Sequence, residues 1–195
     1  KNLNSTLLLG VKFYKSDNTS RQGPGSNNGN ADFNFYTNDF PNYNNQSDYQ
    51  YPNLNVAFFG ENLFCLNDKL SITPGFRIEH IKTESLGSYK KINLDGAGNV
   101  ILNQTINNNN IRKRSFILLG TGISYKGPIE IYGNISQNYR SVTFADISII
   151  NPAYSIDPNI SDEKGHTIDC GFRGELNKYL SFDLSIFNLY YNDRI

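Results

Sequence analysis

The sequence predicts an all-β fold, an antiparallel transmembrane β-barrel segment of about seven strands that belongs to a larger barrel. Three observations predict it. Apolar and polar residues alternate with a period of two, very short connections alternate with very long ones, and charged residues keep to one face of each strand. The chain contains no run of about 18 apolar residues, which excludes a transmembrane helix.

Seven segments have the period-two pattern of strands: 3–15, 53–66, 69–83, 111–126, 129–140, 166–176 and 179–192. The pattern is clearest in the last segment, because Leu180, Phe182 and Leu184 share one face while Ser181 and Asp183 share the other. The same division recurs within 70–79 and 129–136. Each strand is therefore expected to have one apolar and one polar side.

The predicted connections alternate strictly between two lengths. The short ones are tight turns at Asn67-Asp68, Gly127-Pro128 and Asn177-Lys178, and the long ones span 16–52, 84–110 and 141–165. Loops longer than about 12 to 15 residues are uncommon in compact soluble domains. Outer-membrane barrels, in contrast, have short periplasmic turns and long extracellular loops.

The charged residues give an independent test, because a charge that faces hydrocarbon costs about 2 to 4 kcal/mol near the middle of the membrane. If the apolar faces contact lipid, the lumen receives these charges: Lys12, Glu61, Arg77, Glu79, Arg112, Arg114, Glu130, Arg140, Asp169, Arg173, Glu175 and Asp183. Three lysines break the pattern, Lys15, Lys82 and Lys113. Each lies near a long connection, where a lysine can extend its ammonium to the membrane interface.

Composition and motifs exclude several classes of function. The 18 basic and 18 acidic residues leave no net charge, so a nucleic-acid partner is not expected. His80 and His166 are isolated, and neither cysteine has metal-ligand spacing, so no metal site or cofactor is predicted. We find no nucleophile elbow and no phosphate-binding glycine loop, so the chain is not expected to be an enzyme.

The number of strands indicates how the domain is organised. Closed bacterial barrels use an even number of strands, eight or more, and this chain offers seven. An open edge in lipid would leave backbone groups without partners. We therefore expect residues 1–195 to be a partial β-barrel domain, with the remaining strands supplied by a larger protein. No signal peptide is recognisable at Lys1.

Three blocks of sequence resemble the barrel of TonB-dependent outer-membrane receptors. They are ENLFCLNDKLSITPGFRIEHIKTES at 61–85, ISYKGPIEIYGNISQNYRSVTFADIS at 123–148, and IDPNISDEKGHTIDCGFRGELNKYLSFDLSIFNLYYNDRI at 156–195. The DPN-x-x-DEKG motif at 157–165 is most similar to the corresponding sequence of ferric dicitrate transporters. The resemblance implies a barrel of 22 strands, closed by a plug domain and driven by the TonB complex; the plug and the TonB box are not found in this chain.

The resemblance also implies an anionic iron chelate as the substrate, with iron carried inside it. Arginine suits such a ligand, because its planar fork matches carboxylates. Arg112, Arg114 and Arg140 are the predicted substrate-binding residues. The predicted lining of the lumen is Arg77, Glu79, Glu130, Asp169, Arg173, Glu175 and Asp183. The arginines have an alternative role, pairing with luminal acids such as Glu79 or Asp169.

Two other functions stay open at this stage. A glycan or peptide importer of the same superfamily would have aromatic platforms where a chelate importer has cations. A soluble β-sandwich or adhesin module would pack its apolar strand faces against a second sheet.

Overall fold

The computed structural model describes residues 4–25, 29, 34–44, 46–143, 160–177 and 179–193. They form seven strands: β1 (Asn4–Gln22), β2 (Ser47–Cys65), β3 (Leu70–Leu94), β4 (Val100–Lys126), β5 (Ile129–Arg140), β6 (Glu163–Leu176) and β7 (Leu180–Asn192). Within these residues no helix has the length and apolarity needed to cross a membrane.

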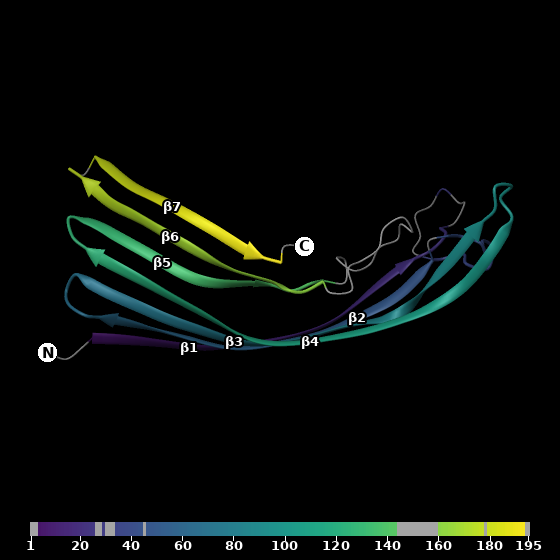
Figure 1. The fold of residues 1–195 in the computed structure, drawn as a ribbon, viewed down its shortest axis with the longest axis horizontal. Coiled ribbons are helices and arrows are strands. Elements are labelled where there is room, and N and C mark those ends of the chain that lie inside the picture. The colour runs from purple at the N-terminus through teal and green to yellow at the C-terminus, as the bar shows by residue number, and fades with distance from the viewer. Residues whose placement is uncertain are drawn as a thin grey trace. The chain divides into compact units, whose positions relative to one another are not determined.

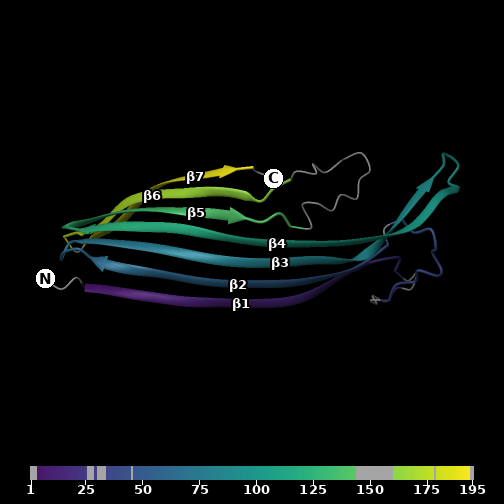
Figure 2. The same ribbon diagram turned by 60° about the horizontal axis from the view of Figure 1, so that its bottom comes forward.

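The strands form one sheet whose spatial order follows the chain, β1-β2-β3-β4-β5-β6-β7 (Figures 1 and 2). The β4–β5, β5–β6 and β6–β7 pairs are antiparallel, and the last two ladders extend over the whole length of their shorter strand. The predicted class, an all-β antiparallel sheet of seven strands, is confirmed.

The chain divides into two compact units, which we describe separately. The first unit comprises Lys1–Lys12, Ala57–Glu79 and Ser115–Ile195, and the second comprises Phe13–Val56 and His80–Arg114. Strands β5, β6 and β7 belong to the first unit alone, whereas β1 to β4 contribute residues to both.

Tight turns join β2 to β3, β4 to β5 and β6 to β7 at one end of the first unit, as the sequence predicts (Figure 1). In the first turn the Asn67 side-chain oxygen accepts hydrogen bonds from the amides of Lys69 and Leu70, at 2.9 and 2.8 Å. In the third, Asn177 has a φ of 51°, a left-handed conformation that asparagine tolerates. Lys178, its predicted partner in this turn, lies outside the described residues.

Two of the predicted long loops are wrong over much of their length. β1 continues to Gln22 and β2 begins at Ser47, so strand replaces both ends of the expected loop 16–52. β3 continues to Leu94 and β4 begins at Val100, so segment 84–110 is a β-hairpin with a short turn. About 9 to 11 residues suffice to cross a membrane as a strand. The parts of β1 to β4 beyond that length continue the sheet without a regular hydrophobic alternation.

The turn of this hairpin is held by Asp95. Its side chain accepts hydrogen bonds from the amides of Ala97 and Asn99 at 2.9 and 2.7 Å, and the Asn99 side chain donates to it at 3.0 Å. The Asn99 side chain and the neighbouring amides hold the pKa of the Asp95 carboxyl below its usual value. Gly98 has a φ of 87°, which only glycine adopts easily. The third predicted loop falls largely on 144–159, outside the described residues.

One face of the strands in the first unit is apolar and exposed. In β4, odd-numbered side chains are exposed and even-numbered ones are half-buried from Ile111 to Tyr125. Ile117 and Leu119 are 60% and 56% exposed, and Ile131 on β5 is 59% exposed. No second sheet covers them within the described part of the chain, which differs from the packing that the alternative β-sandwich requires. We call this side of the first unit the apolar face.

Candidate functional site

The opposite side of the first unit, which we call the polar face, carries a hydrogen-bonded row of charges. Glu130 on β5, Arg173 on β6 and Asp183 on β7 are direct partners in the two ladders. The Arg173 guanidinium donates to both carboxylate oxygens of Glu130, at 2.8 and 3.1 Å. The Ser124 hydroxyl donates to the same carboxylate at 2.6 Å. Arg173 thus neutralises one of the two carboxylates of the row, that of Glu130.

Tyr132 joins this row by lying across a glycine. Its hydroxyl donates to Asp183 at 3.0 Å, and the Arg173 guanidinium lies 5.5 Å from its ring centroid. A Cβ on Gly171 would come within 2.6 Å of the Tyr132 hydroxyl oxygen and 2.5 Å of the Leu184 carbonyl oxygen. The absence of a side chain at Gly171 therefore allows a β5 tyrosine to reach β7.

A second pair lies on the polar face of β3. Arg77 Nε donates to the Glu79 carboxylate at 2.5 Å, and its guanidinium lies 5.7 Å from the centroid of the Phe59 ring. Glu79 is almost completely buried, with 8% of its surface exposed. A buried carboxylate needs a cation and hydrogen bonds to remain charged. The Arg77 guanidinium therefore serves to neutralise Glu79.

Polar residues also line a shallow hollow of about 600 Å³ on this face, together with Arg173 and Tyr132. Asn134 donates to Asp169 at 2.8 Å across the β5–β6 ladder. Among the residues predicted to line the lumen, those on β5, β6 and β7 share this face: Glu130, Asp169, Arg173, Glu175 and Asp183. Arg173 pairs with Glu130 and not with its neighbour Glu175.

The three predicted substrate arginines have different surroundings. Arg140, in the first unit, donates to Glu163 at 2.7 Å, and the Glu163 side chain is only 6% exposed. Beside this pair, Asp162 accepts hydrogen bonds from the Tyr139 hydroxyl at 2.6 Å and from the Val142 amide at 2.8 Å. Arg140 therefore helps to close the end of the β5–β6 ladder.

Arg112 and Arg114 belong to the second unit, where they are alternate residues of β4 and share one face. Arg114 donates to the Thr83 hydroxyl at 3.3 Å. Within the part of the chain that the structure describes, Arg112 makes no ion pair. No carboxylate of the described residues neutralises its guanidinium.

Tyrosine and asparagine side chains share this face of the second unit. Asn108 and Asn110 continue the alternation of β4, and the Asn110 amide donates to Asn108 at 2.8 Å. Asn108 is hydrogen-bonded to the hydroxyl of Tyr49, whose ring stacks on Tyr51 with centroids 5.8 Å apart and an interplanar angle of 16°. We call this set the arginine–tyrosine face: Tyr49, Tyr51, Thr83, Asn108, Asn110, Arg112 and Arg114.

Tyr49 reaches β4 by lying across a glycine of β3. A Cβ on Gly87 would come within 2.7 Å of Tyr49 Cδ1. Burial raises the pKa of the Tyr49 hydroxyl, and the neighbouring Tyr51 and Tyr89 act in the same direction. The hydroxyl is therefore neutral at pH 7 and able to donate a hydrogen bond.

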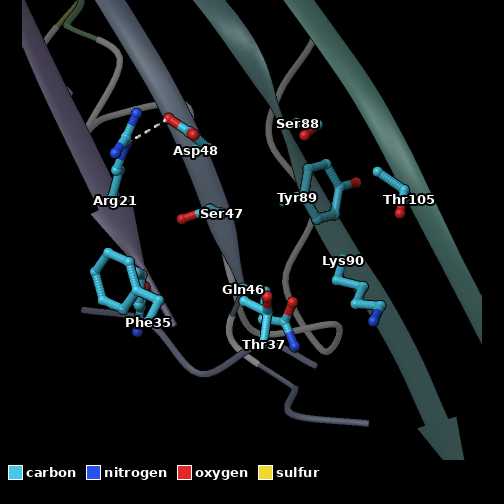
Figure 3. Close-up of a pocket in the computed structure, with 11 residues that line it drawn as sticks. Arg21, Phe35, Thr37, Gln46, Ser47, Asp48, Ser88, Tyr89, Lys90 and Thr105 are labelled. Carbon is cyan, nitrogen blue, oxygen red and sulfur yellow. Dashed lines mark hydrogen bonds and ion pairs between the residues drawn. The ribbon is translucent and has the colours of Figure 1, made fainter. Parts of the chain in front are cut away.

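A cavity of about 230 Å³ lies in the second unit (Figure 3). Arg21 and Asp48 form an ion pair at 3.3 Å in its wall. Asp48 precedes Tyr49 in β2, so the two side chains point to opposite faces. Lys90 donates to the Pro41 carbonyl at 2.5 Å. The charged groups that line this cavity are engaged with one another or with the backbone, and the cavity is the place where segment 34–44 packs against the strands.

Comparison with known proteins identifies the family. The family model described as "TonB dependent receptor-like, beta-barrel" matches residues 1–195. This chain belongs to the β-barrel family of TonB-dependent receptors. No curated protein sequence matches it significantly.

Among solved structures, the chain is similar to the ferric yersiniabactin uptake receptor FyuA from Yersinia pestis. The TM-score is 0.65 at 14% sequence identity, and the match covers 94% of this chain and 25% of FyuA. At this identity the similarity shows the fold. The chain spans about a quarter of the length of that receptor.

Membership in the family agrees with several of the predictions. TonB-dependent receptors are transporters and not enzymes, they reside in the outer membrane, and they generally bind iron chelates and interact with TonB. The family generally binds no cofactor. Among the residues that the structure describes, no three His, Cys, Asp or Glu side chains are grouped as a metal site would require.

The sequence pattern does not predict the tyrosines of the arginine–tyrosine face as site residues. Tyr49 and Tyr51 fall in the predicted loop 16–52 and Asn107 to Asn110 in the predicted loop 84–110, whereas they lie in β2 and β4. A signal was present, because two tyrosines at alternate positions with Gly87 on the next strand are typical of an aromatic ring covering a glycine.

Proposed function

We propose that this chain forms part of the wall and vestibule of an outer-membrane, TonB-dependent transporter that imports an iron chelate. One observation carries the proposal: apolar residues are exposed on one face of the first unit, and the charges of the other face pair with one another. A membrane-spanning wall has this division, with lipid outside and a wet lumen inside. The plug and the TonB contact would come from the rest of the receptor.

The arginine–tyrosine face supports a chelate as the substrate. Iron chelates that carry carboxylates are anionic, and Arg112, which forms no ion pair with the described residues, offers its guanidinium to such a ligand. Tyr49, Asn108 and Asn110 add neutral hydrogen-bonding groups on the same face. The similar fold of FyuA, a ferric yersiniabactin uptake receptor, favours the same class of substrate. Ferric dicitrate is the specific chelate that we propose to test first.

The test measures ligand binding by the full-length receptor. Hydrogen bonds to charged groups contribute about 1.5 to 3 kcal/mol, so each of Arg112→Gln and Arg114→Gln is expected to weaken binding of the chelate about tenfold or more. Arg21→Gln is the matched control, because Arg21 is equally cationic but pairs with Asp48 on the opposite face.

Binding of ferric citrate or ferric siderophores would be followed by quenching of intrinsic fluorescence. If both arginine variants bind every chelate as tightly as the wild type, the proposed site is wrong. If the receptor binds none of them, the proposed substrate class is wrong.

A glycan importer is the second candidate, and the parallel stack of Tyr49 on Tyr51 is the observation that favours it. Aromatic rings bind the apolar faces of sugars as well as planar ligands. A glycan importer would bind neutral oligosaccharides and lose that binding in Tyr51→Leu, while Arg112→Gln would have little effect. A chelate importer would show the opposite dependence.

A further inference from the structure

Three lysines of the second unit point away from the arginine–tyrosine face. Lys113 lies between Arg112 and Arg114 in β4, so its side chain is on the opposite side of the sheet. Lys82 precedes Thr83, whose hydroxyl bonds Arg114, so Lys82 also points to that opposite side. Lys82 and Lys113 are therefore neighbours on adjacent strands.

Lys15 on β1 belongs to the same side. It lies an even number of residues from Arg21, and Arg21 pairs with Asp48 on the side away from Tyr49. If the β1–β2 ladder is followed from the Arg21–Asp48 pair, Lys15 comes opposite Leu54.

The β2–β3 ladder completes the row. Tyr49 lies against Gly87, and five residues further along this antiparallel pair Leu54 comes opposite Lys82. Three lysines thus follow one another across β1, β3 and β4, with Leu54 between the first two. We call Lys15, Lys82 and Lys113 the lysine row.

The surroundings of the lysine row are partly apolar. Phe13 shares the face of Lys15 and is 69% exposed, and Ile111 shares the face of Lys113 and is 56% exposed. Two carboxylates of the described strands share this face with the row: Glu84, which forms an ion pair with Lys82, and Asp17, two residues along β1 from Lys15. The row is a positively charged strip beside exposed apolar side chains.

We propose that the lysine row binds the phosphate groups of a phosphorylated glycolipid in the outer leaflet of the membrane. The inference rests on the proposed function, since it needs this side of the strands to adjoin lipid. A lysine ammonium extends from an apolar surface to the interface, where each basic residue contributes about 1 kcal/mol to the attraction of anionic lipid. Phe13 and Ile111 would contact the acyl chains. A soluble anion would leave both side chains without a partner.

The test uses the full-length receptor in a nonionic detergent. Its affinity is measured for lipid A that carries two phosphates and for the same lipid without phosphate. Lys82→Gln/Lys113→Gln is expected to weaken binding of the phosphorylated lipid about tenfold to thirtyfold. The matched control is Lys69→Gln/Lys126→Gln, which removes two exposed lysines beside the tight turns at the other ends of β3 and β4; its affinity should stay within about twofold.

A variant that binds the lipid more tightly than the wild type serves as a further control, because a misfolded receptor would not gain affinity. Glu84→Gln removes the carboxylate that competes for Lys82 and should tighten binding of the phosphorylated lipid, up to about fivefold. The inference is overturned if the lysine variant and the control lose the same affinity, if both lipids bind equally, or if Glu84→Gln binds no more tightly than the wild type.

Chelate uptake by the same variants separates the two proposals. Lys82→Gln/Lys113→Gln should import the chelate at the wild-type rate. Normal uptake with unchanged lipid affinity overturns the lysine row alone, whereas phosphate-dependent lipid binding by a receptor that imports no chelate overturns only the proposed substrate.

Discussion

An arginine placed at Ile135 tests which side of the sheet faces lipid. Ile135 lies in the middle of β5, is 46% exposed, and is paired with Thr121 on β4 and Ile168 on β6. None of these neighbours is acidic, so a guanidinium at this position would face hydrocarbon without a partner. Arginine on the lipid face costs about 2 to 4 kcal/mol at the midplane of the membrane.

Ser136→Arg is the matched control. Ser136 is also exposed, but it points to the polar face, where Gly120 and Thr167 are its ladder partners. An arginine there enters a wet environment and should change the free energy of unfolding by less than about 1 kcal/mol.

The assay is reversible unfolding of the full-length receptor in phospholipid vesicles by denaturant. Ile135→Arg should lower the free energy of unfolding by about 2 to 4 kcal/mol, which corresponds to a factor of about thirty to several hundred in the folding equilibrium. Equal losses in the two variants, or a larger loss in Ser136→Arg, would refute the assignment of the faces.

Two further predictions concern a glycine and a turn. Gly171→Ala should lower the free energy of unfolding by about 1 to 3 kcal/mol, because its Cβ would come within 2.5 Å of a backbone oxygen. Gly75→Ala should be neutral or stabilising, because the nearest atom to its Cβ would be 3.5 Å away. Denaturant unfolding of both variants measures the difference. Asp95→Ala should lower the hydrogen-exchange protection factor of the Asn99 amide. Since the pKa of Asp95 is lowered, the wild-type protection should be complete above pH 3.8 and decline as the pH falls below it, and Asp95→Ala should lack this decline.

The membrane-facing part of the fold was predictable because lipid imposes a strict pattern. A strand with hydrocarbon on one side and water on the other must alternate apolar and polar residues, and β7 does so from Leu180 to Ile186. The tight turns were predictable for a similar local reason, because Asn67 and Gly127-Pro128 are typical turn residues.

The extensions of β1 to β4 beyond the predicted strands were not predictable, because no alternation of apolar and polar residues marks them. Residues 107–110 are all asparagine and so polar on both faces, and asparagine is more typical of turns than of strands. Backbone pairing and the Asp95 turn hold the β3–β4 hairpin. Neither interaction produces a periodic hydrophobic pattern in the sequence.

The candidate site was predictable only in part. Alternation alone places Arg112 and Arg114 on one face of β4. The contact of Tyr49 with Asn108 across Gly87 depends on the register of three strands, which sequence reasoning did not fix. The ion pair of Arg140 with Glu163 was not predictable either, because it becomes evident only when β5 and β6 are aligned.

The most direct test of the central claim is a scan of spin labels along β4. Single cysteines would be introduced from Ser115 to Tyr125 in a full-length receptor that carries Cys65→Ser and Cys170→Ser, reconstituted in lipid. Relaxation by oxygen, which concentrates in lipid, and by a water-soluble nickel complex would be measured at each position. Oxygen should dominate at odd-numbered positions and nickel at even-numbered ones. A reversed alternation, or none, would contradict a wall with lipid on its apolar side.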